Sequence, residues 1–422
     1  MPTNPPSPAS PDTTCCIVGG GPAGMVLGFL LARAGIHVLV LEKHADFLRD
    51  FRGDTIHPST LELMYELGLL EDFLRRHHQE LTHIGAFIGD FEVTIADFTH
   101  LPTHCKFVGL MPQWDFLNFI AENAKPYPEF HLRMESEVTD LLIEHDRVVG
   151  VRANTKEGPR EFRANLIVGA DGRHSIVRGK AGFQVLDLGA PIDVLWMRVS
   201  RQSGDPEQTL GRFRAGKLLV MLNRDDYWQC AYVITKGAFD AIRQKGLPAF
   251  RHDLETVAPF LRGRTDELKD WDDIKLLSVS VDRLRHWSRP GLLCIGDSAH
   301  AMSPVGGVGI NLAIQDAVAT ANLLAQPLSQ NGSADAHLHK VQQRREFPTR
   351  VTQAGQVMAH KRFIFPALKT TTPLKRLPLP LFLLKHFPIL RRIPARLVGL
   401  GVRPEHVHTP DTHTPNTHKS PR

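Results

Sequence analysis

The sequence has little of what marks a secreted, membrane-spanning or nucleic-acid-binding protein. Its 422 residues include only five cysteines, without paired spacing, which indicates a reducing compartment. No stretch reaches the ~18 uninterrupted apolar residues of a membrane span. The start of the chain is rich in Pro and Ser and has no apolar core of a signal peptide. The net charge of +5 comes without a long Lys/Arg cluster, so we expect a cytoplasmic globular protein without a nucleic-acid partner.

Both ends of the chain have low sequence complexity. We expect a disordered leader over residues 1–13 and a disordered tail over residues 405–422. The tail carries four histidines, but no carboxylate or cysteine frame orders them, so we predict no metal site. Cys15 and Cys16 are neighbours in an expected strand, and we interpret both as core residues.

The first motif is CCIVGGGPAG, residues 15–24, in which a short apolar strand runs into Gly19-x-Gly21-x-x-Gly24. A helix with one apolar face follows from Pro22, which suits the first helical turn. A buried strand then ends at Glu42. This order of strand, glycine turn, helix, strand and acid is typical of the first unit of a dinucleotide-binding fold.

Each glycine of this motif has a physical role in binding a pyrophosphate. Gly19 makes the turn, Gly21 lets the pyrophosphate approach the backbone, and Gly24 lets the helix lie close to the strand. The helix N-terminus then faces the phosphates, and Glu42 accepts hydrogen bonds from ribose hydroxyls. The pattern predicts a dinucleotide but serves NAD, NADP and FAD alike; the alternative is a tight turn in a sheet that binds no nucleotide.

Two further motifs follow in the chain at the ends of predicted strands. The first is NLIVGADGRHSIVR, residues 165–178, in which a strand ends at Gly169-Ala170-Asp171-Gly172. The second begins at residue 291, where a strand ends at Gly296-Asp297-Ser298-Ala299-His300. A loop with Pro304, Gly306, Gly307 and Gly309 then opens a helix at about Ile310.

This ordered set of three motifs resembles the single-component, FAD-dependent class A flavoprotein monooxygenases, the aromatic hydroxylases of the p-hydroxybenzoate hydroxylase type, over residues 14–330. The resemblance implies FAD as the cofactor, with Asp297 at its ribityl and pyrophosphate region and the turn of Gly306 to Asn311 along its isoalloxazine. A helix N-terminus there would stabilise the anion of the reduced flavin. The cofactor-binding residues so implied are Gly19, Gly21, Pro22, Ala23, Gly24, Glu42, Lys43, Arg52, Gln113, Asp171, Gly296, Asp297, Pro304, Gly307, Gly309, Ile310 and Asn311.

Several of these roles rest on the resemblance alone. Arg52 matches an arginine near the FAD pyrophosphate, and Gln113 matches a polar residue that opens a helix; the alternatives are a surface Arg and a helix-end Gln. Asp54 and His57, in GDTIHP, are the candidate catalytic residues, because the chain of the family passes beside the flavin there. Their alternative is a helix cap at Asp54 and a surface position for His57.

The predicted fold class is α/β, with a Rossmann-like FAD-binding domain, an inserted and mostly antiparallel sheet domain, and a helical C-terminal region. The FAD-binding domain is expected to be discontinuous, over residues 14–80, 108–185 and 280–330. Residues 81–107 and 186–279 are expected to form the sheet that supplies the substrate pocket, and 331–404 the helical region. The candidates for the pocket lining are Trp196, Met197, Met221, Tyr227, Trp228 and Tyr232.

The resemblance implies a reaction in which NADH or NADPH, as a transient co-substrate, reduces FAD, O2 forms a flavin C4a-hydroperoxide, and one oxygen is transferred to an aromatic or otherwise electron-rich small molecule. Only one glycine fingerprint is present, so we expect no second nucleotide-binding domain. The Trp-x-Trp-x-Ile-Pro stretch of flavin halogenases is absent. An FAD-dependent reductase or dehydrogenase of the geranylgeranyl reductase type remains the alternative enzyme, and a non-catalytic FAD-binding protein the alternative outside enzymes.

The apolar segment 377–402 carries four cations and four prolines, and it has two interpretations. One is weak peripheral contact with a membrane surface. The other, which we favour because prolines interrupt any long amphipathic helix, is a folded wrap that caps the FAD-binding domain of a monomer or homodimer. The four cations are Lys385, Arg391, Arg392 and Arg396.

Overall fold

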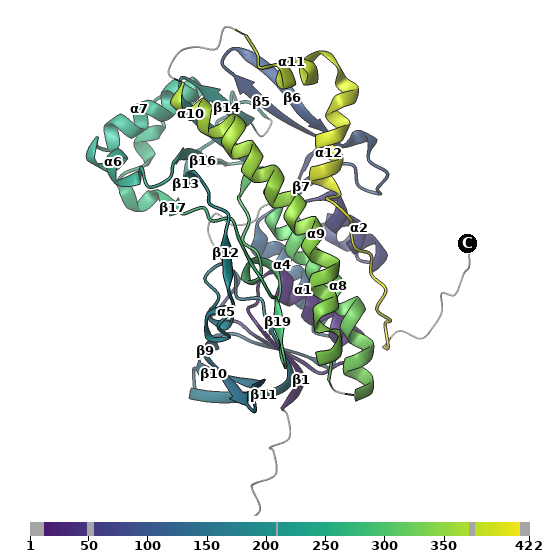
Figure 1. The fold of residues 1–422 in the computed structure, drawn as a ribbon. Helices are drawn as coiled ribbons and strands as arrows, with labels where there is room; N and C mark the ends of the chain where they lie inside the picture. Colours follow the sequence, from purple (N-terminus) through teal and green to yellow (C-terminus); the bar gives the residue numbers. More distant parts are fainter. Residues whose placement is uncertain (1–11, 49–54, 208–209, 332, 371–375, 414–422) are drawn as a thin grey trace, which may run out of the picture.

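The computed structural model describes residues 12–48, 55–207, 210–331, 333–370 and 376–413. Figure 1 shows an elongated molecule with one sheet in its lower half and another in its upper half. The long helix α9 (Asp335–Ala359) runs along both halves. The predicted α/β fold class is confirmed.

The lower sheet has the strand order β19-β20-β11-β1-β2-β8. Its parallel strands are β1 (Thr13–Val18), β2 (Val38–Leu41), β8 (Phe130–Arg133), β11 (Gly158–Gly169) and β20 (Leu292–Cys294), and β19 (Ser288–Arg289) is an antiparallel edge. The first half of β11 pairs instead with β10 (Arg147–Thr155), which pairs with β9 (Glu137–Glu144). Strand β1 lies in the interior of this sheet, between the parallel strands β11 and β2. Strands in this position are buried on both faces, which explains the nearly continuous apolar sequence of β1.

Three helices build the core beside this sheet. Helix α1 (Pro22–Arg33) is buried along almost its whole length and packs against α4 (Gln113–Ala124) and α8 (Gly309–Asn331). In the described part of the chain, the one helix long and apolar enough to cross a membrane is Val305–Gln330, and 72% of its apolar window is buried. That burial makes it a core helix. All five cysteines are buried and free, as predicted for Cys15 and Cys16.

The upper sheet has the order β17-β13-β16-β15-β14-β5-β6 and is antiparallel except where β14 meets β5. Its strands are β5 (His83–Ile88), β6 (Phe91–Asp97), β13 (Ile192–Ser200), β14 (Leu210–Arg214), β15 (Lys217–Asn223), β16 (Tyr227–Thr235) and β17 (Lys275–Leu277). The hairpin of β5 and β6 thus joins strands more than a hundred residues later in the chain.

The two faces of the upper sheet separate the predicted pocket residues. Helices α6 (Phe239–Gln244) and α7 (Leu247–Val257) cover one face, and Met197, Met221, Trp228 and Tyr232 are buried in the core beneath them. These four residues were therefore wrong as lining candidates: strand alternation sends them to the helix-covered face. Trp196 lies on the other face, in a cluster that includes Val305.

Short elements connect the two halves. Strands β3 (Thr55–Ile56), β4 (Gln79–Leu81) and β7 (Val108–Leu110) form a small antiparallel sheet, and β12 (Val185–Asp187) pairs with β18 (Asp282–Leu284). Helices α2 (Pro58–Glu66) and α3 (Leu70–Leu74) follow β3, and α5 (Ile176–Lys180) follows the second motif.

The C-terminal region is helical. A π-turn (His360–Ile364), α10 (Phe365–Lys369), α11 (Leu379–His386) and α12 (Arg392–Gly399) follow α9. Helices α11 and α12 pack against β6 of the upper sheet, and the end of α12 also reaches the FAD-binding half, where the Val398 carbonyl oxygen lies 2.7 Å from Nδ1 of His57.

The expectations for the two chain ends need correction. Thr13, assigned to the leader, begins β1. Residues 405–413, assigned to the tail, lie along the lower half: Glu405 is buried beside Arg345, and Asp411 pairs with Arg33. These ion pairs, of which that of Glu405 is buried, hold the segment in place, and composition alone did not reveal them.

Candidate flavin site

Three loops meet at one edge of the lower sheet. The register aligns Val18 with both Leu41 and Gly169, and Gly169 with Cys294. Parallel strands that end at the same level place the following residues side by side, so the three sequence motifs share one crevice. This is the position at which open parallel sheets bind ligands.

The three glycines of the first motif have three different surroundings. A Cβ on Gly19, whose φ is +108°, would lie 2.4 Å from the Ala170 carbonyl oxygen. A Cβ on Gly24 would lie 2.0 Å from the Gly19 carbonyl oxygen. A Cβ on Gly21, directly before α1, would meet no protein atom within 4 Å. Packing therefore requires glycine at positions 19 and 24, whereas Gly21 borders open space at a helix N-terminus.

Glu42 organises the loop beside this glycine turn. Its Oε2 accepts a hydrogen bond from the Gly20 N–H at 2.8 Å, and its Oε1 accepts one from the His44 N–H at 3.1 Å. The side chain is buried, whereas the neighbouring Lys43 is exposed. Glu42 thus joins the end of β2 to the first motif, as the predicted βαβ unit requires.

The second and third motifs are joined by an ion pair. Nη2 of Arg173 lies 3.2 Å from Oδ2 of Asp297, and both side chains are partly exposed. Asp171 accepts a hydrogen bond from the Val177 N–H at 3.1 Å, and burial raises the pKa of its carboxyl group. Within the described residues, Oδ1 of Asp171 and Nη1 of Arg173 are buried atoms without a hydrogen-bond partner. The crevice therefore contains polar atoms that a bound ligand can satisfy.

A buried network of charged side chains, centred on Asp316 of α8, holds the turn of the third motif in place. Asp316 accepts from the Gly296 N–H at 3.0 Å, from Nε2 of His300 at 2.5 Å, and from Nε of Arg345 at 2.9 Å. Burial opposes ionisation of Asp316, but the charges and hydrogen bonds of His300 and Arg345 outweigh it and lower the pKa of this carboxyl group. Arg345 also pairs with Glu405 at 3.1 Å, which connects the C-terminal segment to the Gly296 turn.

Asn311, in the first turn of α8, ties α2 to the glycine loop. Its Oδ1 accepts from the His57 N–H and from the Thr60 hydroxyl, each at 2.8 Å. Its Nδ2 donates to the carbonyl groups of Thr55 at 3.0 Å and Gly307 at 3.3 Å. The amide is thus fully engaged within the protein, so a contact of this residue with a cofactor would come through its backbone.

His57 lies inside the protein and not on its surface. It directly precedes α2, and its ring is 1% exposed. Nδ1 lies 2.7 Å from the Val398 carbonyl oxygen of α12, to which it donates when it carries the proton. Burial lowers the pKa of His57 to about 4, against a smaller opposing effect of this hydrogen bond. The imidazole is therefore neutral at pH 7.

The remaining predicted residues lie around the same loops. Pro304 begins the turn that contains Gly306 and Gly307, both with positive φ, and Gly309 and Ile310 begin α8. Gln113 begins α4, just after β7, which pairs with β3 next to His57. Arg52 and Asp54 lie outside the described residues, so their roles stay predictions.

Helix α9 contributes polar contacts to the site that the sequence did not reveal. Gln353 donates to the Asp282 and Ala301 carbonyls, and Gln356 donates to the carbonyls of Ser303 and Val305. Nε2 of His360 lies 2.8 Å from the Ser303 hydroxyl. The signal in the sequence is weak: these polar residues and Arg345 recur at helical spacing, which is equally typical of a solvated face.

The residues present fit FAD. Gly21 leaves open space at the N-terminus of α1 where a pyrophosphate belongs, and the crevice contains unsatisfied polar atoms of Asp171 and Arg173. Asp297 stands between the second motif and the glycine loop, with its carboxylate partly exposed. These donors and acceptors suit a ligand with phosphates and a chain of hydroxyl groups.

Comparison with known families decides between the nucleotides. The FAD binding domain family matches residues 12–355, which include all three motifs. The chain belongs to this family. FAD is therefore the cofactor, as predicted, and the resemblance to class A flavoprotein monooxygenases is confirmed.

Individual relatives support the same assignment. The 6-methylpretetramide 4-monooxygenase of Streptomyces rimosus is 33% identical over 353 residues, 82% of this chain and 83% of that protein. The rifampicin monooxygenase of Streptomyces venezuelae is 29% identical over 308 residues, 71% of this chain and 61% of that protein. The crystal structure of p-nitrophenol 4-monooxygenase PnpA from Pseudomonas putida DLL-E4 has a TM-score of 0.74 at 21% identity, over 93% of this chain and 98% of that chain. This structural similarity shows the fold.

Proposed function

We propose that the protein is an FAD-dependent monooxygenase that uses NADH or NADPH and O2 to hydroxylate an aromatic or otherwise electron-rich small molecule. The observation that carries the proposal is the crevice at the aligned strand ends, where Gly21 leaves open space at the N-terminus of α1 and the motif with Asp297 follows the neighbouring strand β20. The names of the relatives support the reaction class, since the 6-methylpretetramide and rifampicin enzymes are both monooxygenases.

Each motif has a task in holding the cofactor. The N-terminus of α1 at Gly21 would take the pyrophosphate, Glu42 an adenosine ribose, and Asp297 the ribityl hydroxyls. When bound, FAD supplies the chemistry that protein side chains lack, namely acceptance of a hydride and activation of O2. The N–H groups that begin α8 at Gly309 would stabilise negative charge developing beside them.

The upper sheet offers an apolar wall for the substrate. Its face opposite α7 carries Val194, Trp196, Val220 and Ala231, and Val305 of the glycine loop packs into the same cluster. A planar aromatic substrate fits such a wall, because an aromatic ring buries a large apolar area when it lies against apolar side chains. By analogy with the 6-methylpretetramide enzyme, we infer that polycyclic phenols are the first class to test.

His57 is proposed as a positioning residue beside the reacting centre. Its buried, neutral ring has its Nδ1 next to the Val398 carbonyl, so it is poorly placed to gain or lose a proton at pH 7. Its N–H holds Asn311, which in turn holds the Gly307 carbonyl. We therefore do not assign His57 the role of general acid or base, although histidine is the residue that most often has this role.

The experiment that tests the function is a turnover assay with the purified FAD-loaded protein. NADPH and NADH oxidation and O2 uptake are followed for a panel of polycyclic phenols, and products are analysed by mass spectrometry. A substrate that stimulates both rates and gains one oxygen atom supports the proposal. Substrate reduction without O2 uptake would support the reductase alternative. The Gly21→Ala variant, built to lose FAD, controls for background oxidation.

A further inference from the structure

The C-terminal region has an unusual charge composition. Between Glu346 and Glu405 the sequence contains no Asp or Glu, whereas Lys or Arg occurs eleven times. Over the whole chain the two signs are nearly balanced, with 50 Lys and Arg against 45 Asp and Glu. The excess of positive charge is therefore concentrated in this one segment.

Helices α11 and α12 and the turn between them also expose large apolar side chains. Of the sixteen large hydrophobic residues that are exposed among the described residues, six lie between positions 379 and 397. We call these six the apolar face; they are Leu379 (68% exposed), Phe382 (45%), Phe387 (52%), Ile389 (65%), Ile393 (60%) and Leu397 (54%). A concentration of this kind marks an interaction site.

Packing on the other side fixes the orientation of this face. Ala395 and Val398 pack with Phe98 and Leu101 beneath α12. A Cβ on Gly399 would lie 2.8 Å from a side-chain atom of Leu101, so the helix already sits tightly on its support. The exposed residues of α12 cannot turn inward without breaking these contacts.

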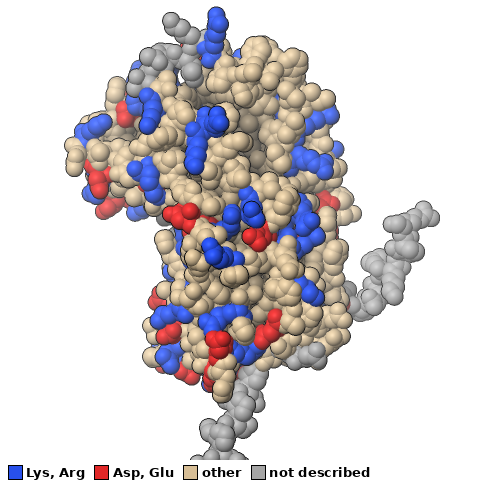
Figure 2. All heavy atoms as spheres, in the orientation of Figure 1, with Lys and Arg blue, Asp and Glu red and all other residues tan. Residues whose placement is uncertain are grey.

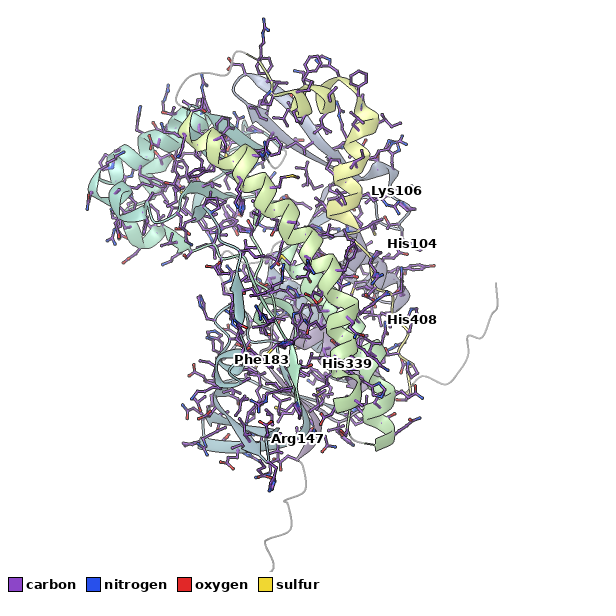
Figure 3. All side chains as sticks on the ribbon, in the orientation of Figure 1. His104, Lys106, Arg147, Phe183, His339 and His408 are labelled. Atoms are coloured by element: carbon purple, nitrogen blue, oxygen red, sulfur yellow. The ribbon has the colours of Figure 1, made fainter. Side chains whose placement is uncertain are left out.

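Cations surround the apolar face. Arg392 and Arg396 are exposed on α12, and Arg391 joins α11 to α12 by donating to the carbonyls of Leu384 and Lys385. None of these arginines, nor Lys385, takes part in an ion pair with another described residue. Figure 2 shows tan and blue atoms over α11 and α12. By contrast, Arg147, labelled at the opposite pole in Figure 3, pairs with Asp335.

We propose that the apolar face and its cations form a docking surface for an anionic lipid bilayer. Apolar side chains flanked by unpaired Lys and Arg match the boundary between acyl chains and acidic headgroups. The mode of contact is peripheral: α11 and α12 have eight residues each, about 12 Å of helix, against a hydrocarbon core of about 30 Å.

A second copy of the chain is a poorer occupant of this surface. In a two-fold dimer the same patch meets itself, so Arg392 and Arg396 of both subunits would be brought together. No acidic residue lies in the segment to neutralise them, and like charges at an interface cost free energy. Anionic headgroups supply the missing negative charge.

The test is co-sedimentation of the full-length, FAD-loaded protein with vesicles. Vesicles of phosphatidylcholine alone are compared with vesicles that contain 30% phosphatidylglycerol, at low and high salt. We expect binding to the anionic vesicles only, and we expect it to fall with salt because exposed charges are screened. The assay needs no turnover, so its outcome is independent of the proposed enzymatic function.

Two double variants separate the charges from the apolar side chains. Arg392→Gln with Arg396→Gln should weaken binding about twenty-five-fold, since each cation near an anionic surface contributes about fivefold. Ile393→Ser with Leu397→Ser should weaken it at least about tenfold, because both side chains are exposed and would enter the interface. Matched controls are Lys125→Gln with Lys245→Gln, and Ile143→Ser with Val185→Ser, at exposed positions outside α11 and α12.

Unchanged binding in the two test variants, or no binding of the unmodified protein to anionic vesicles, would overturn the proposal. Light scattering tests whether a second copy of the chain occupies the surface instead. A dimer that dissociates in the Ile393→Ser and Leu397→Ser variant would identify a self-interface and refute lipid docking. FAD content is measured for every variant to confirm folding. Ile389→Ser, which lies outside α12, repeats the apolar test should the double variant fail to fold.

Discussion

A pair of glycine substitutions separates the packing role of the first motif from its cofactor role. Gly21→Ala and Gly24→Ala add the same methyl group three residues apart. At Gly24 the new Cβ would lie 2.0 Å from the Gly19 carbonyl oxygen, a backbone atom that cannot rotate away. At Gly21 it would meet no protein atom within 4 Å, and the backbone there, with φ of −76°, accepts alanine.

The expected magnitudes follow from these contacts. Gly24→Ala forces α1 away from β1, at a cost of about 3 kcal/mol or more, since overpacking already costs about 1–3 kcal/mol where side chains can adjust. Gly21→Ala changes the stability of the FAD-free protein by less than about 1 kcal/mol, the size of a helix-cap effect. It should nevertheless weaken FAD binding at least about a hundredfold, because the methyl group blocks the approach of a pyrophosphate to the N-terminus of α1.

Two measurements on each variant give the answer. Thermal or urea unfolding of the FAD-free proteins reports stability, and titration with FAD, followed by quenching of flavin fluorescence, reports affinity. We expect a stable Gly21→Ala protein that does not retain FAD. A Gly21→Ala protein that binds FAD as tightly as the unmodified protein would refute the placement of the pyrophosphate.

Other predictions concern affinity, pH and the buried charges. The purified protein should carry about one non-covalent FAD per chain, released by acid precipitation. Asp297→Ala should weaken FAD binding about ten- to a hundredfold with little loss of stability, as expected for a hydrogen bond to a charged group of about 1.5–3 kcal/mol. The depressed pKa of His57, about 4 in the folded protein against 6.5 as the ordinary value, should make stability fall as pH drops from 6.5 to 4, by about 3 kcal/mol in total, since only the unfolded chain takes up the proton. Arg345→Met should cost about 3–5 kcal/mol, because the buried carboxylates of Asp316 and Glu405 would each lose one of their ionic partners.

Each of these expectations can fail in a recognisable way. Flavin that stays with the precipitated protein would disprove non-covalent binding. Unchanged FAD affinity in Asp297→Ala would remove this residue from the cofactor site. His57→Gln should abolish its share of the pH dependence, and an identical pH profile would show that another group is responsible. Arg350→Ala, an exposed change on the same helix, is the control for Arg345→Met and should leave stability nearly unchanged.

The sequence predicted the lower sheet and its glycine loops well, because local signals specify them. The apolar run of β1, Pro22 at the start of α1 and the acid at the end of β2 each indicate their own element. The spacing of Gly19, Gly21 and Gly24 is also a local signal, and it predicted a pyrophosphate site from the sequence alone. The structure then shows a different reason for glycine at each of the three positions, and the spacing alone does not distinguish these reasons.

Long-range contacts explain most of what the sequence did not predict. Met197 and Trp228 resembled pocket residues, but only the strand register and the position of α7 decide which face they occupy. Glu405 resembled part of a disordered tail because its partner, Arg345, lies 60 residues earlier. The buried state of His57 depends on α12, which comes more than 300 residues later in the chain.

The fate of isotopic oxygen distinguishes a monooxygenase from a reductase. The FAD-loaded protein is incubated with NADPH or NADH, a polycyclic phenol that stimulates nicotinamide oxidation, and 18O2, and the product is analysed by mass spectrometry. A monooxygenase places one 18O atom in the product for each nicotinamide oxidised, and the Gly21→Ala variant places none. Oxidation of nicotinamide with a reduced product that carries no 18O would contradict the account.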